Sequence, residues 1–115
     1  MNNLTINEKE ADDILVITPV GRIDVQQMVQ LRKFFESLKE KSFVHVTINM
    51  ADVTFIDSYG VSVLTNFSNQ LKLQEGLLTF YNCRKEIGDF LKIAGVNQII
   101  PILETFDDVK EHFQG

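Results

Sequence analysis

Hydrophobic and polar positions alternate along the chain with two periods, one typical of strands and one of helices. Residues 4–8 alternate between apolar and polar side chains, which predicts an edge strand. Residues 14–20 form a nearly continuous apolar run, typical of a strand covered on both faces, although Pro19 limits pairing near its end. After a turn at residues 21–24, the apolar spacing predicts a helix over about residues 25–41, with Asp24 as its cap.

The second half of the chain continues this alternation. Residues 43–49 alternate as a strand with one fully apolar face, and residues 77–81 and 99–103 form two further short strand-like segments. A short amphipathic helix that ends at Gly95 and a last helix capped by Thr105 complete the pattern. Strands that alternate with helices predict an α/β fold, with a mixed sheet of about four to five strands packed with about four helices.

The segment 54–60, Thr-Phe-Ile-Asp-Ser-Tyr-Gly, ends an apolar run and starts a helix. Apolar side chains recur at helical spacing beyond it, so we expect a helix of roughly four turns that begins near Asp57 or Ser58. Asp57 is suited to cap this helix, because a carboxylate accepts hydrogen bonds from the unpaired N–H groups of the first turn. Ser58 would then lie exposed at the helix start, where a hydroxyl serves as a cap, a nucleophile or a phosphate acceptor.

Composition and charge narrow the classes of function. The length of 115 residues and the 44% of hydrophobic residues suit one compact domain over residues 1–115. The net charge of −5 argues against direct binding of nucleic acid, which depends on clustered Lys and Arg, and suits a protein partner. We expect no membrane insertion, because no apolar run is long enough to cross a bilayer, and a cytoplasmic location as the default.

Enzyme chemistry has little support in the residues. Ser58 lacks the Gly-x-Ser-x-Gly elbow of hydrolases, since Ile56 stands at the first glycine position, and only His45 and His112 are available as bases. Two separated histidines and a single cysteine, Cys83, give no metal-ligand spacing, and no glycine-rich phosphate loop occurs. We therefore expect no catalytic activity, no cofactor and no metal, and a packing role for Cys83.

Three aspartates stand where a strand gives way to a turn or helix: Asp24, Asp52 and Asp57. Capping and turn formation explain all three. In a mostly parallel sheet, however, the loops that leave the strands gather at one edge, where α/β folds usually bind their partners. Asp24, Asp57 and Ser58 are then expected to share a surface, to which Tyr59 adds either an interface residue or simple packing against a neighbouring helix.

The whole chain resembles a STAS domain of the bacterial anti-sigma factor antagonist type. Its length, the turn at residues 21–24 (Gly-Arg-Ile-Asp), the segment 53–61 around Ser58 and the late segment 91–96 carry the resemblance. Three positions depart from the family pattern: Asn49 stands where an aspartate is common, Tyr59 where a small residue follows the serine, and Val96 where leucine follows the glycine. An amide at position 49 can keep the turn hydrogen bonds but loses a charge.

The resemblance implies a function as a partner switch. In this family the unmodified domain binds an anti-sigma factor that is also a serine kinase, which frees a sigma factor; a serine phosphatase restores the binding form. Ser58 aligns with the phosphorylated serine, and Asp24, Asp57, Ser58, Tyr59 and Gly60 are the expected partner-binding residues. The same resemblance permits an alternative, a non-phosphorylated assembly module such as a lipid-transport ATPase subunit or a stress-signalling scaffold.

Overall fold

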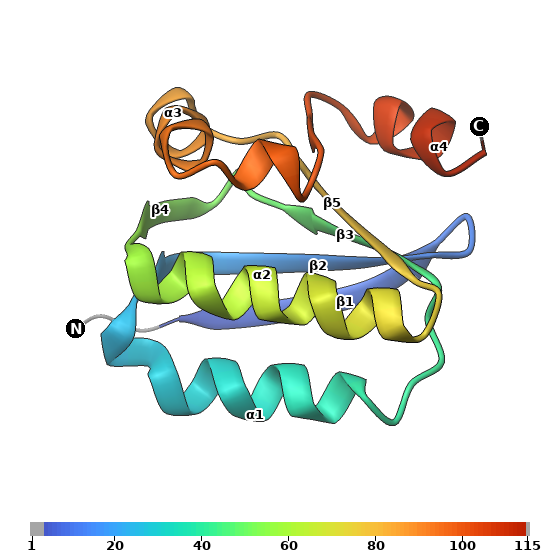
Figure 1. Ribbon diagram of the computed structural model, residues 1–115, viewed down its shortest axis with the longest axis horizontal. Helices are drawn as coiled ribbons and strands as arrows, with labels where there is room; N and C mark the ends of the chain where they lie inside the picture. The colour runs from blue at the N-terminus through green and yellow to red at the C-terminus, as the bar shows by residue number, and fades with distance from the viewer. Residues whose placement is uncertain (1–3, 115) are drawn as a thin grey trace.

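The computed structural model describes residues 4–114 and contains a mixed sheet packed with helices (Figure 1). The α/β class and the mixed sheet are as the sequence predicts, but the sheet has six strands. The strands are β1 Thr5–Ala11, β2 Ile14–Ile23, β3 His45–Asn49, β4 Val53–Ile56, β5 Leu77–Tyr81 and β6 Ile102–Leu103. The four α-helices are α1 Met28–Leu38, α2 Ser58–Leu73, α3 Lys85–Ile93 and α4 Phe106–Gln114, and short 3-10 turns, η1 Val25–Gln27 and η2 Val96–Gln98, precede α1 and follow α3.

Strand β4 is the element that the sequence pattern did not predict. Only its first and last residues, Val53 and Ile56, are buried, so its four residues show no period-two alternation. It pairs with the distal end of β2 and is separated from β3 by a turn of three residues. That pairing also corrects the turn expected at residues 21–24, because β2 continues through Ile23.

Strand β2 makes three ladders with its neighbours. It pairs antiparallel with the edge strand β1 along its length, and parallel with β3 through residues 15–17 and with β4 through residues 21–23. Pro19 lies between the two parallel ladders, where its missing N–H group removes no bond to β3 or β4. The switch of partner along β2 lets the carboxyl ends of β2 and β4 lie side by side.

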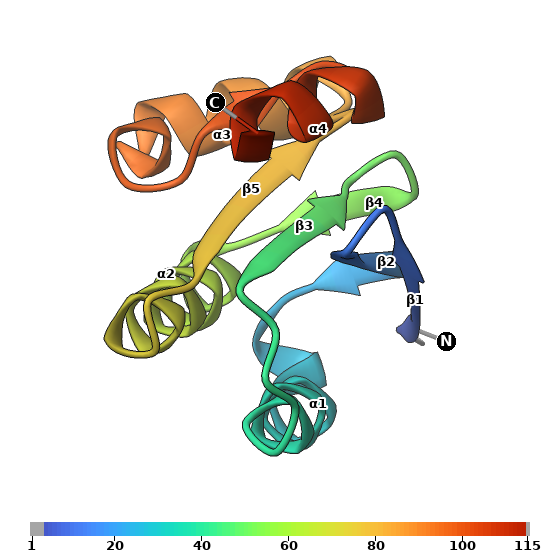
Figure 2. The same ribbon diagram turned by 90° about the vertical axis from the view of Figure 1, so that its right-hand side faces the viewer.

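Helices cover the sheet on both faces, as Figures 1 and 2 show. Helices α1 and α2 lie together on one face, where their apolar side chains join the main core with Leu15 and Ile17 of β2. Ile14 and Val16, which alternate with them along β2, form a second cluster with Val109 of α4. The prediction that this strand is covered on both faces is therefore confirmed.

Several boundaries differ from the sequence expectation. The helix expected from residue 25 begins as a 3-10 turn, becomes α-helical at Met28 and ends at Leu38. The strand expected over residues 99–103 shortens to Ile102–Leu103, because η2 takes the preceding turn. Helix α4 is capped as expected, since the Asp108 N–H donates to Thr105 Oγ1 at 3.1 Å and the Thr105 N–H donates to Asp108 Oδ2 at 3.2 Å.

Candidate functional site

Asp57 connects the two chain segments that leave β2 and β4. It is the N-cap of α2: its Oδ1 accepts a hydrogen bond from the Gly60 N–H at 2.9 Å. Its Oδ2 accepts a second bond, at 3.1 Å, from the Val25 N–H in the turn after β2. Both carboxylate oxygens are thus used within the fold, and one side chain fixes the position of two loops at the carboxyl edge of the sheet.

Asp24 lies beside Asp57 in the fold but faces inward. Its side chain is 5% exposed, and Oδ2 accepts from Arg22 Nε at 2.9 Å while Oδ1 accepts from the Gln26 N–H at 3.1 Å. The Arg22 guanidinium also lies 4.1 Å above the ring centre of Phe55, its register partner on β4. Asp24 therefore shapes the turn, and the surface that it supports is presented by Arg22, Phe55 and Val25.

Ser58 is exposed and is the first residue of α2. Because Asp57 already caps the helix, the serine hydroxyl is not needed for that role. The nearby backbone N–H groups of the first turn and the positive end of the helix dipole favour an anion at this point. The sequence leaves three roles open for Ser58: helix cap, nucleophile and phosphate acceptor. Asp57 takes the first of these roles.

Gly60 is buried and allows α2 to approach β2 closely. A Cβ atom at this position would lie 2.9 Å from Ile23 Cγ2 and 2.9 Å from Ile56 Cγ1, and it would overlap the carbonyl oxygen of Ile23. Contacts of this kind are not tolerated, so any larger side chain must push the helix start away from the sheet. The close approach is what sets the height of Ser58 above the strand ends.

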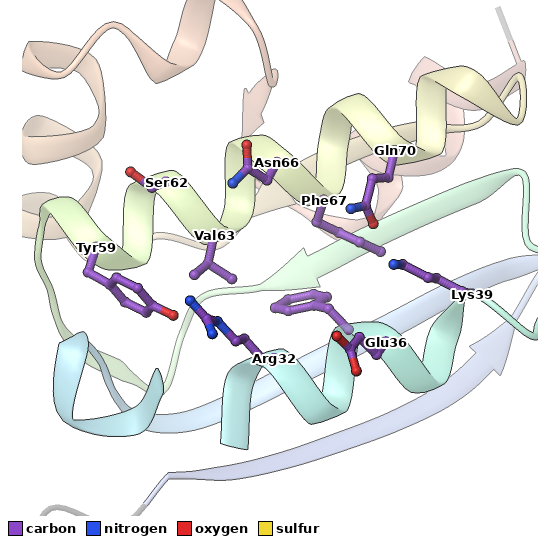
Figure 3. Close-up of a pocket in the computed structure, with 10 residues that line it drawn as sticks. Arg32, Glu36, Lys39, Tyr59, Ser62, Val63, Asn66, Phe67 and Gln70 are labelled. Atoms are coloured by element: carbon purple, nitrogen blue, oxygen red, sulfur yellow. The ribbon is translucent and has the colours of Figure 1, made fainter. Parts of the chain in front are cut away.

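Tyr59 turns away from Ser58 and toward α1. Its ring packs against the main core, and its hydroxyl is buried without a hydrogen-bond partner among the described residues. Figure 3 shows this hydroxyl pointing toward Arg32 across a groove between α1 and α2. Of the five residues predicted to bind a partner, Ser58 is exposed and Asp57 and Tyr59 are half-buried, whereas Asp24 and Gly60 lie beneath the surface.

The groups considered for enzyme or metal chemistry have structural roles elsewhere. His45 is the first residue of β3 and stacks on Phe113 with ring centres 4.4 Å apart, while His112 packs edge-on against the same ring. In Figure 1 the start of β3 lies at the end of the sheet opposite to the start of α2. Burial raises the pKa of the Cys83 thiol to about 11, which keeps it protonated and unreactive at neutral pH. Among residues 4–114, no group of three or more His, Cys, Asp or Glu could hold a metal ion.

Two features of the site escaped the sequence pattern. Val25 is 50% exposed beside Asp57, and Phe55 is 39% exposed under Arg22, so an apolar surface adjoins the start of α2. Nothing local marks these side chains, because their position depends on the register between β2 and β4. Asn49, by contrast, keeps the turn as expected: its Oδ1 accepts from the Ala51 N–H at 3.1 Å.

The profile of the STAS domain matches residues 5–112. The chain belongs to the STAS domain family. An anti-sigma-B factor antagonist of Bacillus subtilis is 27% identical over 100 residues, which cover 87% of this chain and 91% of that protein. This STAS chain contains, within residues 4–114, no helix long and apolar enough to span a bilayer.

Two solved structures share the fold of this chain at low sequence identity. The crystal structure of an anti-sigma factor antagonist from Mycobacterium paratuberculosis has a TM-score of 0.88 at 19% identity and covers 99% of this chain and 97% of its own. The structure of the Bacillus cell fate determinant SpoIIAA in the phosphorylated form has a TM-score of 0.69 at 15% identity and covers 95% of this chain and 99% of its own. These likenesses support the fold assignment.

Proposed function

We propose that this protein is an anti-sigma factor antagonist that is switched by phosphorylation of Ser58. The unphosphorylated form binds an anti-sigma factor with serine-kinase activity and so releases a sigma factor. The observation that carries the proposal is the exposed Ser58 hydroxyl at the start of α2, left free by the cap that Asp57 provides. Two relatives support the same function. One is named an anti-sigma-B factor antagonist, and another, SpoIIAA, was solved in a phosphorylated form.

The surroundings of Ser58 suit a switch that acts on association. A phosphate adds about −1.5 to −2 charges at neutral pH together with three acceptor oxygens. The N-terminus of α2 tolerates this charge, so the fold is expected to survive. Val25 and Phe55 nearby are exposed apolar groups that a partner would cover, and a phosphate at their edge is costly to desolvate. Binding is therefore lost while the domain stays folded.

The other predicted partner-binding residues take different parts in this proposal. Asp57 fixes both loops, and Asp24 and Gly60 set the shape of the edge from beneath. Tyr59 contributes through its ring at the side of the surface. ATP and phosphotransfer belong to the kinase and dephosphorylation to a serine phosphatase, so we propose a regulatory binding protein of the cytoplasm, formed by one STAS domain, rather than an enzyme.

Phosphorylation of the purified protein tests the modification. The chain is incubated with ATP and candidate anti-sigma factor kinases of its own organism, and the phosphate is located by mass spectrometry. We expect one phosphate on Ser58, none in Ser58→Ala, and normal labelling of Ser62→Ala, a variant of an exposed serine one turn further along α2. Label that persists in Ser58→Ala would contradict the assignment of the site.

Affinity measurements test the switch. Ser58→Ala is expected to bind the anti-sigma factor as the wild type does, whereas Ser58→Asp weakens binding at least ~10-fold, or ~1.4 kcal/mol. Ser42→Asp is the matched control, because it adds the same charge at an exposed position in the loop after α1. Equal affinities for the wild type and Ser58→Asp, with stable association whatever the state of Ser58, would favour the alternative of a non-phosphorylated assembly module.

A further inference from the structure

A groove of about 330 Å³ runs between α1 and α2 (Figure 3). Helix α2 contributes residues spaced along one side, from Tyr59 to Gln70. The other side is formed by residues of α1 from Arg32 onward and by Lys39, the C-cap of that helix. Ser58 does not line it. The volume lies within the range of small-molecule sites. Of the residues proposed above for the anti-sigma factor surface, the groove includes Tyr59 but not Asp24, Val25, Phe55, Asp57, Ser58 or Gly60.

The floor of the groove is apolar and aromatic. Phe35 and Phe67 meet there with ring centres 4.5 Å apart, and Val63 lies beside them. Both phenylalanines are buried, at 8% and 6% exposure, so their rings are held in place by the core beneath. A flat apolar group would bury its surface against this floor at no cost in reordering the protein.

The rim carries charges that the fold does not use. Arg32 and Glu36 lie one turn apart on α1, and Lys39 is the residue that caps its carboxyl end. Within residues 4–114 none of the three side chains makes an ion pair or a hydrogen bond. On a helix, opposite charges three or four residues apart are close enough to form a stabilising pair. Here Glu36 is four residues from Arg32 and three from Lys39, yet all three side chains remain available to a ligand.

The Tyr59 hydroxyl is a second unused group, at the Arg32 end of the groove. It is buried and has no partner within the described residues, an arrangement that destabilises a folded protein. In Figure 3 it points toward the guanidinium of Arg32, which is an exposed and long side chain. The hydroxyl and the guanidinium thus place two kinds of hydrogen-bond donor at one end of the groove, a combination that recognises a carboxylate.

We propose that the α1–α2 groove binds a small organic monoanion, a carboxylate joined to a flat apolar group. The carboxylate lies between Arg32 and the Tyr59 hydroxyl, and the apolar group lies on Phe35 and Phe67. Glu36, one turn beyond Arg32, repels a second negative charge and so selects a singly charged ligand over a dianion. Binding satisfies the hydroxyl that the free protein leaves without a partner.

Titration of isotopically labelled protein, followed by its amide NMR spectrum, tests the site. The probe is naphthoate, with acetate as the anion without an apolar body and naphthylmethanol as the body without a charge. We expect saturable shifts of α1 and α2 amides along the groove with naphthoate, and at least ~10-fold weaker binding of the other two compounds. Saturable shifts confined to another part of the chain, or acetate binding as tightly as naphthoate, would overturn the proposal.

Three variants test whether naphthoate binds in the groove or is only attracted to positive charge on α1. Arg32→Gln is expected to weaken naphthoate binding at least ~10-fold, and Lys33→Gln, which removes the same charge from the next residue of α1 outside the groove, leaves it unchanged. Tyr59→Phe weakens binding about fivefold and leaves the melting temperature of the free protein equal or higher, because an unpaired hydroxyl is removed. Equal losses in the two cationic variants, or a lower melting temperature in Tyr59→Phe, would refute the assignment.

Discussion

Gly60 is the position where the structure makes the sharpest energetic prediction. Substitution by alanine adds one methyl group that would lie 2.9 Å from Ile23 Cγ2 and 2.9 Å from Ile56 Cγ1, and that would overlap the Ile23 carbonyl oxygen. The two side chains can shift, but the oxygen belongs to the backbone of β2, beside the ladder that β2 forms with β4. The methyl group can therefore be accommodated only if the first turn of α2 lifts from the sheet.

The expected magnitude follows from two opposing effects. Overpacking of a closely packed site costs about 1–3 kcal/mol, and a clash with backbone places Gly60→Ala near the upper end. Alanine returns at most ~1 kcal/mol through its higher helix propensity. We therefore expect the free energy of unfolding to fall by about 2 kcal/mol. Gly60→Val adds two further methyl groups and is expected to be less stable still.

Gly88 provides a matched control within α3. A Cβ atom there would meet only Cys83 Cβ at 3.6 Å, an ordinary contact, so Gly88→Ala gains helix propensity without a clash. We expect this variant to be more stable than the wild type by about 0.5–1 kcal/mol. Urea denaturation followed by circular dichroism measures both variants. If Gly60→Ala is as stable as Gly88→Ala, the close approach of α2 to β2 does not limit the side chain at position 60, and the reasoning is refuted.

Three further predictions concern other groups. Asp57→Ala is expected to lower the free energy of urea unfolding by about 1–2 kcal/mol, because the Gly60 and Val25 N–H groups lose their acceptor; an unchanged value would contradict the capping role. The free energy of unfolding of Asn49→Asp should stay within about 0.5 kcal/mol of the wild-type value, since an aspartate oxygen can accept the same hydrogen bond from the Ala51 N–H. A larger loss in the same assay would mean that the N–H₂ group of Asn49 is needed. The pKa of the Cys83 thiol is about 11 in the folded protein against 9.0 for the free thiol, so this thiol ionises in the unfolded chain at lower pH. The free energy of unfolding therefore falls as the pH rises from 9.0 to about 11. In a series of urea denaturations over this pH range, Cys83→Ala should show a smaller fall than the wild type.

The start of α2 illustrates how much of the structure the local sequence predicts. Asp57 was predicted as the cap and Ser58 as the exposed first residue of a helix, and the structure has both. Capping depends on a few consecutive residues, and helical periodicity on one segment, so each can be recognised without knowledge of the rest of the fold. The burial of β2 on both faces could be predicted in the same way, because a nearly continuous apolar run leaves neither face of the strand suited to solvent.

Tertiary structure alone decided the features that join distant segments. Four features depend on pairing or packing between separate elements. They are strand β4, the hydrogen bond from the Val25 N–H to Asp57, the fit of Gly60 against Ile23, and the burial of the Tyr59 hydroxyl, which has no partner within residues 4–114. A sequence records which side chains favour a strand or a helix start. Register and packing arise only when the assembled sheet sets two segments against each other, so they leave no mark in either segment by itself.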